Sequence, residues 1–487
     1  MNKRIGVGLA AAKVFRFLFA STLLVLAGWT FYASGQTVTT LYQFGGIPSN
    51  GVIPVATLVQ GSDGNFYGTT KFGGNATAVY SGGVGTVFRV SSTGNLTTLW
   101  DFGIGATDGQ IPIAGLVQGS DGYFYGTTWI SAATTGYGSV YRISPSGNLT
   151  TLHLFNGGTD GSEPYAALVE GTDGYFYGTT TAGGTNHQGT VFQISSTGTL
   201  TTVWQFGGFT TDGRKPYGAL LQGNDGYFYG TTFAGGTSNS GTVFRVSSSG
   251  NETNLYSFGS HQNDGSQPYA GLTLGSDGYF YGTTYEGGTN NDGTIFRISP
   301  SGTYTTLYSF GSHQNDGSQP YAGLTLGSDG YFYGTATQGG FWGGGTAFRI
   351  SSAGVLTTLW PFGDLYDLIQ GDEPYGGLVQ GSDGSFYGTT YAGGTNSVGN
   401  VYLLSVPLTP PANQISAIQL ADTNIIFSIP SVAYETYQLQ FSSSMTPTNW
   451  VNVPGVSVTN SIGALLTVTN FGGAIGPQGF YRFAITP

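Results

Sequence analysis

Short apolar and aromatic runs alternate with tight polar turns along most of the chain, and the same pattern returns seven times. In the fifth block the apolar runs are residues 268–274, 279–284, 294–298 and 303–310. A Ser-Asp-Gly turn, a Gly-rich loop and a Ser-Pro-Ser-Gly turn separate them. Runs of this length between Asp-Gly and Ser-Gly turns are typical of antiparallel hairpins. We therefore predict four antiparallel strands per block, called a, b, c and d in chain order.

A Tyr-Gly-Thr motif in strand b sets the period of the blocks. Its tyrosines are Tyr67, Tyr125, Tyr177, Tyr229, Tyr281, Tyr333 and Tyr387, spaced 58, 52, 52, 52, 52 and 54 residues apart. A period near 50 residues with four strands per repeat indicates the blade of a β-propeller. A parallel β-helix would lack the hairpins.

The repeats begin out of frame, which predicts a closed ring. Strands of type d are expected at residues 38–44, 96–102, 149–155, 200–206, 252–258, 304–310 and 356–362. The first of these precedes any strand a, and the last block, residues 374–404, has no strand d. The N-terminal strand can complete the last blade and so remove its exposed edge. The predicted fold class is all-β, with a seven-bladed propeller over residues 36–406.

Two sequence blocks carry a family resemblance. Residues 275–284 (Gly-Ser-Asp-Gly-Tyr-Phe-Tyr-Gly-Thr-Thr) and 293–299 (Gly-Thr-Ile-Phe-Arg-Ile-Ser) resemble the GloVer repeat family of bacterial exported proteins. The resemblance covers about residues 38–406. It implies a propeller-like repeat array and carries over no activity.

The N-terminal segment, residues 1–35, is predicted to be a signal peptide. Its basic residues precede an uncharged, mostly apolar run at 17–32, and Ala33, Ser34 and Gly35 then offer a cleavage point. The alternative is an uncleaved anchor, because the run is nearly long enough to span a bilayer. We expect a secreted or outer-surface protein with no transmembrane span after cleavage.

A different composition follows the last repeat. Residues 407–411 form a Pro-rich linker, and residues 412–487 contain six short alternating runs. These runs predict a small β-sandwich of immunoglobulin or fibronectin-like size. It could serve secretion or attachment, or be a structural appendage.

The charge balance excludes two classes of partner. The chain has 13 Lys and Arg against 24 Asp and Glu, and four of the basic residues lie in the first 35. Without that segment nine basic residues face 24 acidic ones, a net charge of −15. So acidic a surface repels nucleic acid and anionic membranes. The chain has no cysteine, so core packing must stabilise it without disulfides.

An Asp-Gly pair occupies every a–b turn. The pairs are Asp63 and Gly64, Asp121 and Gly122, Asp173 and Gly174, Asp225 and Gly226, Asp277 and Gly278, Asp329 and Gly330, and Asp383 and Gly384. A calcium site is conceivable, but a hairpin that needs positive φ explains both residues. We read the pairs as structural and predict neither metal nor cofactor.

Catalytic motifs are missing from the sequence. The four histidines lack metal-ligand spacing, and there is no Gly-x-Ser-x-Gly. Residues 255–283 and 307–335 are identical, as expected of interchangeable structural units. Catalysis, by contrast, needs different groups at one place. Whether the protein is an enzyme stays undecided, and these features weigh against catalysis. The alternative is a glycan lyase or hydrolase using the acidic residues of the seventh junction, which are Asp364, Asp367, Asp372 and Glu373.

The d–a and b–c loops should emerge on one face, because successive strands alternate in direction. These loops hold nearly all the differences between blocks, and variation on a rigid scaffold is where recognition is usually placed. The candidate ligand-binding residues are His261, Asp264, His313, Asp316 and Trp342. The predicted function is binding or adhesion, with polysaccharide or an envelope component such as a surface protein as partner.

Overall fold

The computed structural model describes residues 36–45, 50–74, 83–105, 108–131, 136–364 and 370–406. It also describes the C-terminal strand segments 417–421, 424–430, 436–442, 451–459, 465–470 and 480–486. Each named element in these ranges is a β-strand. No helix among these residues is long and apolar enough to cross a membrane.

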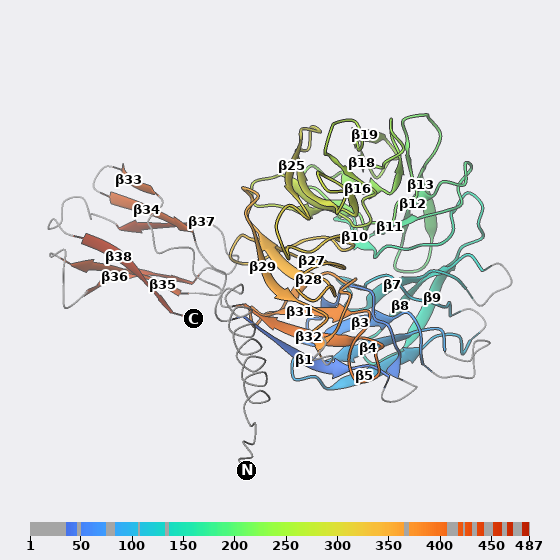
Figure 1. The fold of residues 1–487 in the computed structure, drawn as a ribbon, viewed down its shortest axis with the longest axis horizontal. Helices are drawn as coiled ribbons and strands as arrows, with labels where there is room; N and C mark the ends of the chain where they lie inside the picture. The colour runs from blue at the N-terminus through green and yellow to red at the C-terminus, as the bar shows by residue number, and fades with distance from the viewer. Residues whose placement is uncertain are drawn as a thin grey trace, which may run out of the picture.

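Seven four-stranded antiparallel sheets form the blades of a β-propeller (Figure 1). The a strands are β2 (Val59–Gln60), β6 (Val117–Gln118), β10 (Val169–Glu170), β15 (Leu221–Gln222), β21 (Thr273–Leu274), β26 (Thr325–Leu326) and β30 (Val379–Gln380). The b strands are β3 (Phe66–Thr70), β7 (Phe124–Thr128), β11 (Phe176–Thr180), β16 (Phe228–Thr232), β22 (Phe280–Thr284), β27 (Phe332–Ala336) and β31 (Phe386–Thr390). The c strands are β4 (Thr86–Val90), β8 (Ser139–Ile143), β12 (Thr190–Ile194), β18 (Thr242–Val246), β24 (Thr294–Ile298), β28 (Thr346–Ile350) and β32 (Asn400–Ser405). The d strands are β5 (Leu96–Asp101), β9 (Leu149–Leu154), β13 (Leu200–Gln205), β19 (Glu252–Ser257), β25 (Tyr304–Ser309), β29 (Leu356–Pro361) and β1 (Thr37–Gln43).

The N-terminal strand closes the ring, as its frame predicts. β1 pairs antiparallel with β32, in a register that sets Val38 opposite Leu404. In Figure 1 the blue β1 lies beside the orange β32. Just beyond β1, Phe44 is buried in a cluster with Phe66 and Phe88 of the first blade. The first strand therefore joins the two ends of the repeat array.

Aromatic stacking repeats at each of the seven blade interfaces. The strand-b tyrosine of one blade stacks on the first phenylalanine of strand b in the next, with ring centroids 3.8–4.0 Å apart. The seventh stack, Tyr387 on Phe66, joins the last blade to the first at 3.9 Å. Stacked pairs of this kind add about 0.5–1.5 kcal/mol each beyond their buried area.

A ring of hydrogen bonds lies beside the aromatic ring. A strand-b threonine in each blade donates to a backbone carbonyl in the a segment of the next blade, at 2.7–3.5 Å. Thr389 closes this second ring by donating to the Ala56 carbonyl at 3.1 Å.

The strand-a prediction was too long. Residues 268–274 are an apolar run, but only Thr273 and Leu274 pair with β22. The preceding segment serves the neighbouring blade, because the Ala270 carbonyl accepts the Thr231 hydroxyl at 2.7 Å. A side chain from outside the sheet thus replaces the ladder bond that strand a would have made.

The glycine in strand b permits close packing between strands. A Cβ added at Gly282 would lie 2.6 Å from Cζ of Phe296 and 2.8 Å from Cδ2 of Leu272. Real Cβ atoms do not approach so closely, so the phenylalanine of strand c fills the space over this glycine.

The C-terminal part forms two three-stranded sheets, as expected for a small sandwich. One has the order β33-β34-β37 and the other β36-β35-β38. The strands are β33 (Ala417–Ala421), β34 (Asn424–Pro430), β35 (Thr436–Ser442), β36 (Val451–Thr459), β37 (Leu465–Asn470) and β38 (Phe480–Thr486). Each of the six predicted runs contributes one strand. The predicted signal peptide and Pro-rich linker lie outside the described residues.

Candidate ligand-binding face

The d–a and b–c loops pair with each other, which confirms that they share one face. In the fourth blade β14 (Gly213–Arg214) pairs with β17 (Ala234–Gly235), and in the fifth β20 (Gly265–Ser266) pairs with β23 (Glu286–Gly287). The other five blades make the same contact as a single bridge, such as Ser162 with Ala182. This pairing is not among the contacts predicted from the sequence.

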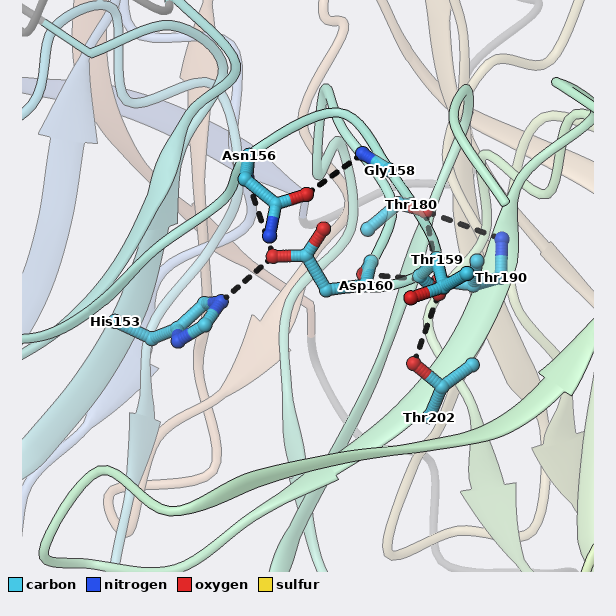
Figure 2. A network of polar contacts seen from close by, with 8 residues as sticks. All are labelled: His153, Asn156, Gly158, Thr159, Asp160, Thr180, Thr190 and Thr202. Atoms are coloured by element: carbon cyan, nitrogen blue, oxygen red, sulfur yellow. Dashed lines mark hydrogen bonds and ion pairs between the residues drawn. The ribbon is translucent and has the colours of Figure 1, made fainter. Parts of the chain in front are cut away.

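A buried aspartate organises the d–a loop in five blades. Figure 2 shows the loop between the second and third blades, where Asp160 Oδ2 lies 3.1 Å from His153 Nε2 and accepts the Asn156 N–H at 3.1 Å. The Gly158 N–H in turn donates to Asn156 Oδ1 at 2.7 Å. Such charge-assisted bonds hold a loop that has no ladder of its own. The carboxylate therefore fixes the loop between d and a.

Threonines tie this loop to its blade. The hydroxyls of Thr180 in strand b and Thr190 in strand c lie 2.9 Å apart and are fully buried. Thr190 also donates to the Asp160 carbonyl at 3.4 Å (Figure 2). The loop thus rests on the rigid strands below it.

The predicted pair His261 and Asp264 forms one such loop unit. Asp264 is 7% exposed and accepts the Tyr256 hydroxyl at 2.7 Å and the N–H groups of Gly259 and His261 at 3.1 and 3.2 Å. The His261 ring is exposed and lies parallel to Tyr256, with Nδ1 3.3 Å from its hydroxyl. The carboxylate positions the loop, and the imidazole is its accessible group.

The loop between the fifth and sixth blades repeats the arrangement. Asp316 is 4% exposed and accepts the Tyr308 hydroxyl at 2.7 Å and the His313 N–H at 3.1 Å. His313 is exposed beside Tyr308. The two histidines lie on separate loops, and the structure records no contact between them.

Trp342 lies in the b–c loop of the sixth blade with Phe341. The two rings meet edge to face with centroids 4.7 Å apart, and their side chains are 37% and 44% exposed. They form an exposed aromatic pair on the variable face.

The Asp-Gly turns have a structural role. In each one the strand-b tyrosine donates its hydroxyl to the aspartate at 2.6–2.9 Å. The following glycines have φ between 79° and 83°. Positive φ is needed only at the glycine. The aspartate accepts hydrogen bonds from the tyrosine hydroxyl and from the backbone N–H two residues further along the chain. Within the described ranges, no group of three or more His, Asp or Glu side chains could hold a metal ion.

The strand-c arginines stack on the tyrosine that follows these turns. Arg297 lies 5.0 Å from the Tyr279 ring centroid, and Arg349 lies 4.7 Å from that of Tyr331. Arg349 also approaches Asp329 at 3.9 Å. Repeated cation–π contacts of this kind are structural.

The acidic residues of the seventh junction are only partly described. Asp367 lies outside the described residues. Burial and the nearby Asp372 carboxylate raise the pKa of Glu373. Glu373 directly precedes the proline that launches the next a segment.

Seven residues at this pre-proline position have positive φ, from 52° to 61°. They are Ile53, Ile111, Glu163, Lys215, Gln267, Gln319 and Glu373. Such angles are uncommon outside glycine and costly for β-branched isoleucine. Each residue bridges blades: the Glu163 N–H donates to the Tyr137 carbonyl at 2.9 Å, and its carbonyl accepts from Thr181 at 3.1 Å. Contacts between the blades therefore hold these seven residues, which we call the strained pre-proline ring, in an unfavourable backbone conformation.

Tyrosines directly after the prolines converge near the axis. They are Tyr165, Tyr217, Tyr269, Tyr321 and Tyr375, from blades three to seven, and we call them the tyrosine cluster. Neighbouring rings in this order have centroids 4.9, 5.2, 4.6 and 5.1 Å apart. The Tyr165 and Tyr321 hydroxyls meet at 2.6 Å although their blades are three apart. The cluster therefore reaches across the ring.

Aromatic side chains from the b–c loops surround the tyrosine cluster. Phe233 lies 5.0 Å from Tyr269, Tyr285 lies 5.3 Å from Tyr269, and Tyr391 lies 5.2 Å from Tyr375. Burial raises the pKa of Tyr269 to about 12, with neighbouring tyrosines adding to the shift. The phenols are therefore neutral hydrogen-bonding groups at physiological pH.

Sequence reasoning missed this cluster. The available signal was the Pro-Tyr dipeptide, which recurs in five of the seven blocks. The predicted strand a of the fifth block, residues 268–274, includes Tyr269 as an ordinary strand residue. Nothing in a single blade shows that this position faces the axis.

The closed ring of blades and its variable face define a β-propeller repeat protein. A profile described as the Gloeobacter/Verrucomicrobia repeat matches residues 77–275 and 218–415. The chain belongs to this repeat family, which confirms the resemblance found in the sequence. The comparison with curated proteins found no match.

Solved structures share the fold at low identity. The extracellular domain of BT3049 from B. thetaiotaomicron, described as a hybrid two-component system, aligns with TM-score 0.51 and 11% identity. The alignment covers 93% of this chain and 55% of that one, so the chain spans about half its length. This likeness shows the fold alone. PorZ of Porphyromonas gingivalis gives TM-score 0.48 and 14% identity over 87% of this chain and 56% of that one.

Proposed function

We propose that this protein is an exported, non-catalytic propeller that binds a polysaccharide or an envelope component outside the cell or at its surface. The observation that carries the proposal is the division of the ring into two faces. The turn face repeats one Asp-Gly-Tyr arrangement seven times, whereas the opposite face carries the loops that differ. A constant scaffold with one variable face is suited to recognition.

Export is supported by the basic and apolar segment at residues 1–35. The absence of cysteine does not conflict with export, because stacked and hydrogen-bonded rings link the blades without disulfides. Nothing in the proposal requires a cofactor.

On the variable face, His261, His313 and Trp342 are proposed to contact the ligand, while Asp264 and Asp316 position the histidines. Exposed imidazole and indole rings can stack on sugar faces and donate hydrogen bonds to hydroxyls.

The test is a binding screen of the full chain against polysaccharides and envelope proteins, repeated with His313→Ala plus Trp342→Ala. Because these side chains are exposed, the double variant should bind at least about tenfold more weakly while its melting temperature stays within about 2 °C of the wild type. Ser276→Ala, on the turn face, is the control and should bind normally. Uniformly negative screens would refute the binding function, and loss of binding in the Ser276 variant alone would refute the choice of face.

A further inference from the structure

The tyrosine cluster has more polar groups than a structural plug requires. At the same position the first two blades carry Val55 and Ile113, and Ile113 is 8% exposed. Aliphatic side chains therefore fill this level of the ring where filling is all that is needed. The five tyrosines are only half-buried, and each brings a hydroxyl that must be satisfied.

Most of these hydroxyls are left for an outside partner. Tyr165 and Tyr321 satisfy each other at 2.6 Å. The hydroxyls of Tyr217, Tyr269 and Tyr375 have no hydrogen bond to any described residue, and none of them is a fully buried oxygen. Three phenols thus direct hydrogen-bonding capacity toward solvent from one packed aromatic surface.

The surrounding charges decide which ligand could use that surface. Burial raises the pKa values of Tyr217, Tyr269 and Tyr375, and the negative charges of Glu163, Glu286 and Glu373, respectively, add to the shifts. Three carboxylates near one cluster disfavour an anionic ligand. Lys215 is the exposed cation at the same level.

From this arrangement we infer that the tyrosine cluster is a binding subsite for an uncharged sugar chain. Phenol rings stack on the C–H faces of sugars, and the free hydroxyls exchange hydrogen bonds with sugar hydroxyls. The strained pre-proline ring holds each tyrosine at the start of its a segment, so the surface is preorganised and little ordering cost remains for binding. This inference rests on the proposed function and adds to it a ligand class and a second, axial site.

The experiment uses the full chain and a panel of soluble polysaccharides, with dextran, laminarin and xyloglucan as neutral members and alginate and polygalacturonate as anionic members. A poly-L-proline peptide is included because aromatic surfaces also bind proline-rich segments. Affinity is measured by affinity electrophoresis and then by calorimetry on any ligand that binds.

Two variants separate binding from folding. Tyr217→Phe plus Tyr269→Phe keeps both rings and removes two hydroxyls, and it should bind a neutral polysaccharide about tenfold more weakly at an unchanged melting temperature. Tyr269→Ala also removes a stacking ring and should bind more weakly still. Tyr175→Ala is the matched control, because Tyr175 is 41% exposed and directly follows an Asp-Gly turn on the opposite face.

A second readout follows the tyrosines directly. Nitration by tetranitromethane, mapped by mass spectrometry, should be slowed at Tyr217, Tyr269 and Tyr375 by the bound polysaccharide and unchanged at Tyr175. Both measurements are made at low and high salt, and binding of a neutral chain should not weaken as salt screens charge.

The outcomes separate the two proposals. If the wild type binds neutral polysaccharide and the tyrosine variants bind equally well without nitration protection, the axial subsite is wrong and the proposed function stands. If only the anionic polysaccharides or poly-L-proline bind, the uncharged-sugar inference is overturned. If nothing in this panel or in the envelope-protein screen binds, the proposed function fails as well.

Discussion

The strand-c residue that lies over the strand-b glycine is phenylalanine in five blades and tyrosine in two. The tyrosines are Tyr141 and Tyr402, and both are fully buried. Their hydroxyls find no hydrogen-bond partner among the described residues, and burial raises the pKa of both phenols. A buried unsatisfied hydroxyl costs about 1–3 kcal/mol, so each of these two tyrosines lowers the free energy of unfolding.

Replacing either tyrosine by phenylalanine should stabilise the protein. We expect Tyr141→Phe and Tyr402→Phe each to raise the free energy of unfolding by about 1 kcal/mol, and the double variant by the sum, because the sites lie in different blades. Tyr333→Phe is the control with the opposite sign, since the Tyr333 hydroxyl donates to Asp329 at 2.8 Å. Denaturant unfolding compares the four variants with the wild type, and a loss of stability in Tyr141→Phe would contradict the argument.

Glu252 is a second residue that departs from its repeat. Four blades carry leucine at this position, at residues 96, 149, 200 and 356. The Glu252 side chain is largely buried with Oε1 unpaired among the described residues, and burial together with the Asp212 charge raises its pKa to about 7. The fourth blade therefore carries an ionisable carboxyl group where four other blades carry an apolar leucine.

This position should make stability depend on pH. The folded pKa of Glu252 lies above the ordinary glutamate value of 4.5, so the folded state holds the proton more tightly than the unfolded chain. Below pH 4.5 both states are protonated and the group costs no ionisation energy; stability then falls as pH rises through about 7. Glu252→Gln should remove this fall, a gain of up to about 2–3 kcal/mol above pH 7 and almost none at pH 4. Equal gains at both pH values would exclude ionisation as the cause.

At the scale of elements, a single carboxylate in the d–a loop makes the hydrogen bonds that a paired strand would otherwise make. Asp316 accepts hydrogen bonds from the Tyr308 hydroxyl and from the N–H groups of Gly311 and His313. This one side chain therefore holds the loop in place of a series of strand-pairing bonds. In the N-terminal junction Asn50 stands at this position and donates to the Tyr42 hydroxyl at 2.5 Å. The polarity of the bond is reversed, but the connection between strand d and the loop is kept.

Substituting the central carboxylate should loosen the loop without opening the ring. Asp316→Asn keeps one acceptor oxygen and loses the charge, so we expect a cost of about 1–3 kcal/mol and faster amide exchange at Gly311 and His313. Because residues 255–283 and 307–335 are identical, Asp264→Asn should show a similar cost and faster exchange at Gly259 and His261. Unchanged exchange at these amides in both variants would show that the loops are held by other contacts.

Sequence alone could predict the strands that pair within a blade, because hairpin turns and apolar runs are local signals. Strand c at residues 294–298 coincides with β24, and the d strands agree to within a residue or two at each end. Contacts between blades could not be predicted in the same way. The short strand a at Thr273–Leu274 and the axial position of Tyr165 depend on neighbours outside their own blade. The sequence places the candidate histidines in the d–a loops, where the structure also has them, but the burial of Asp264 and Asp316 depends on the three-dimensional arrangement of those loops.

In the whole molecule, two side-chain contacts repeat around the ring, and the first strand adds a further link between its two ends. The stack of Tyr387 on Phe66 and the bond from Thr389 to Ala56 join the last blade to the first through side chains. β1 adds the only backbone ladder, among the described residues, between the two ends of the repeat array. The chain itself connects successive blades at six junctions. The ring is closed at the seventh by the noncovalent pairing of β1 with β32.

Deleting residues 36–45 should therefore weaken the entire ring and not merely one edge. The change removes the β1 ladder and the buried Phe44 side chain, which is 1% exposed, so we expect a loss on the order of 5 kcal/mol together with association through the uncovered edge of β32. Calorimetry and sedimentation velocity measure the two effects. A synthetic peptide of residues 36–45 should restore the melting temperature and the monomer, whereas the same peptide with Phe44→Ala should restore much less. If the truncated chain keeps the melting temperature of the intact protein, the ring is held by its side-chain contacts and the first strand is dispensable.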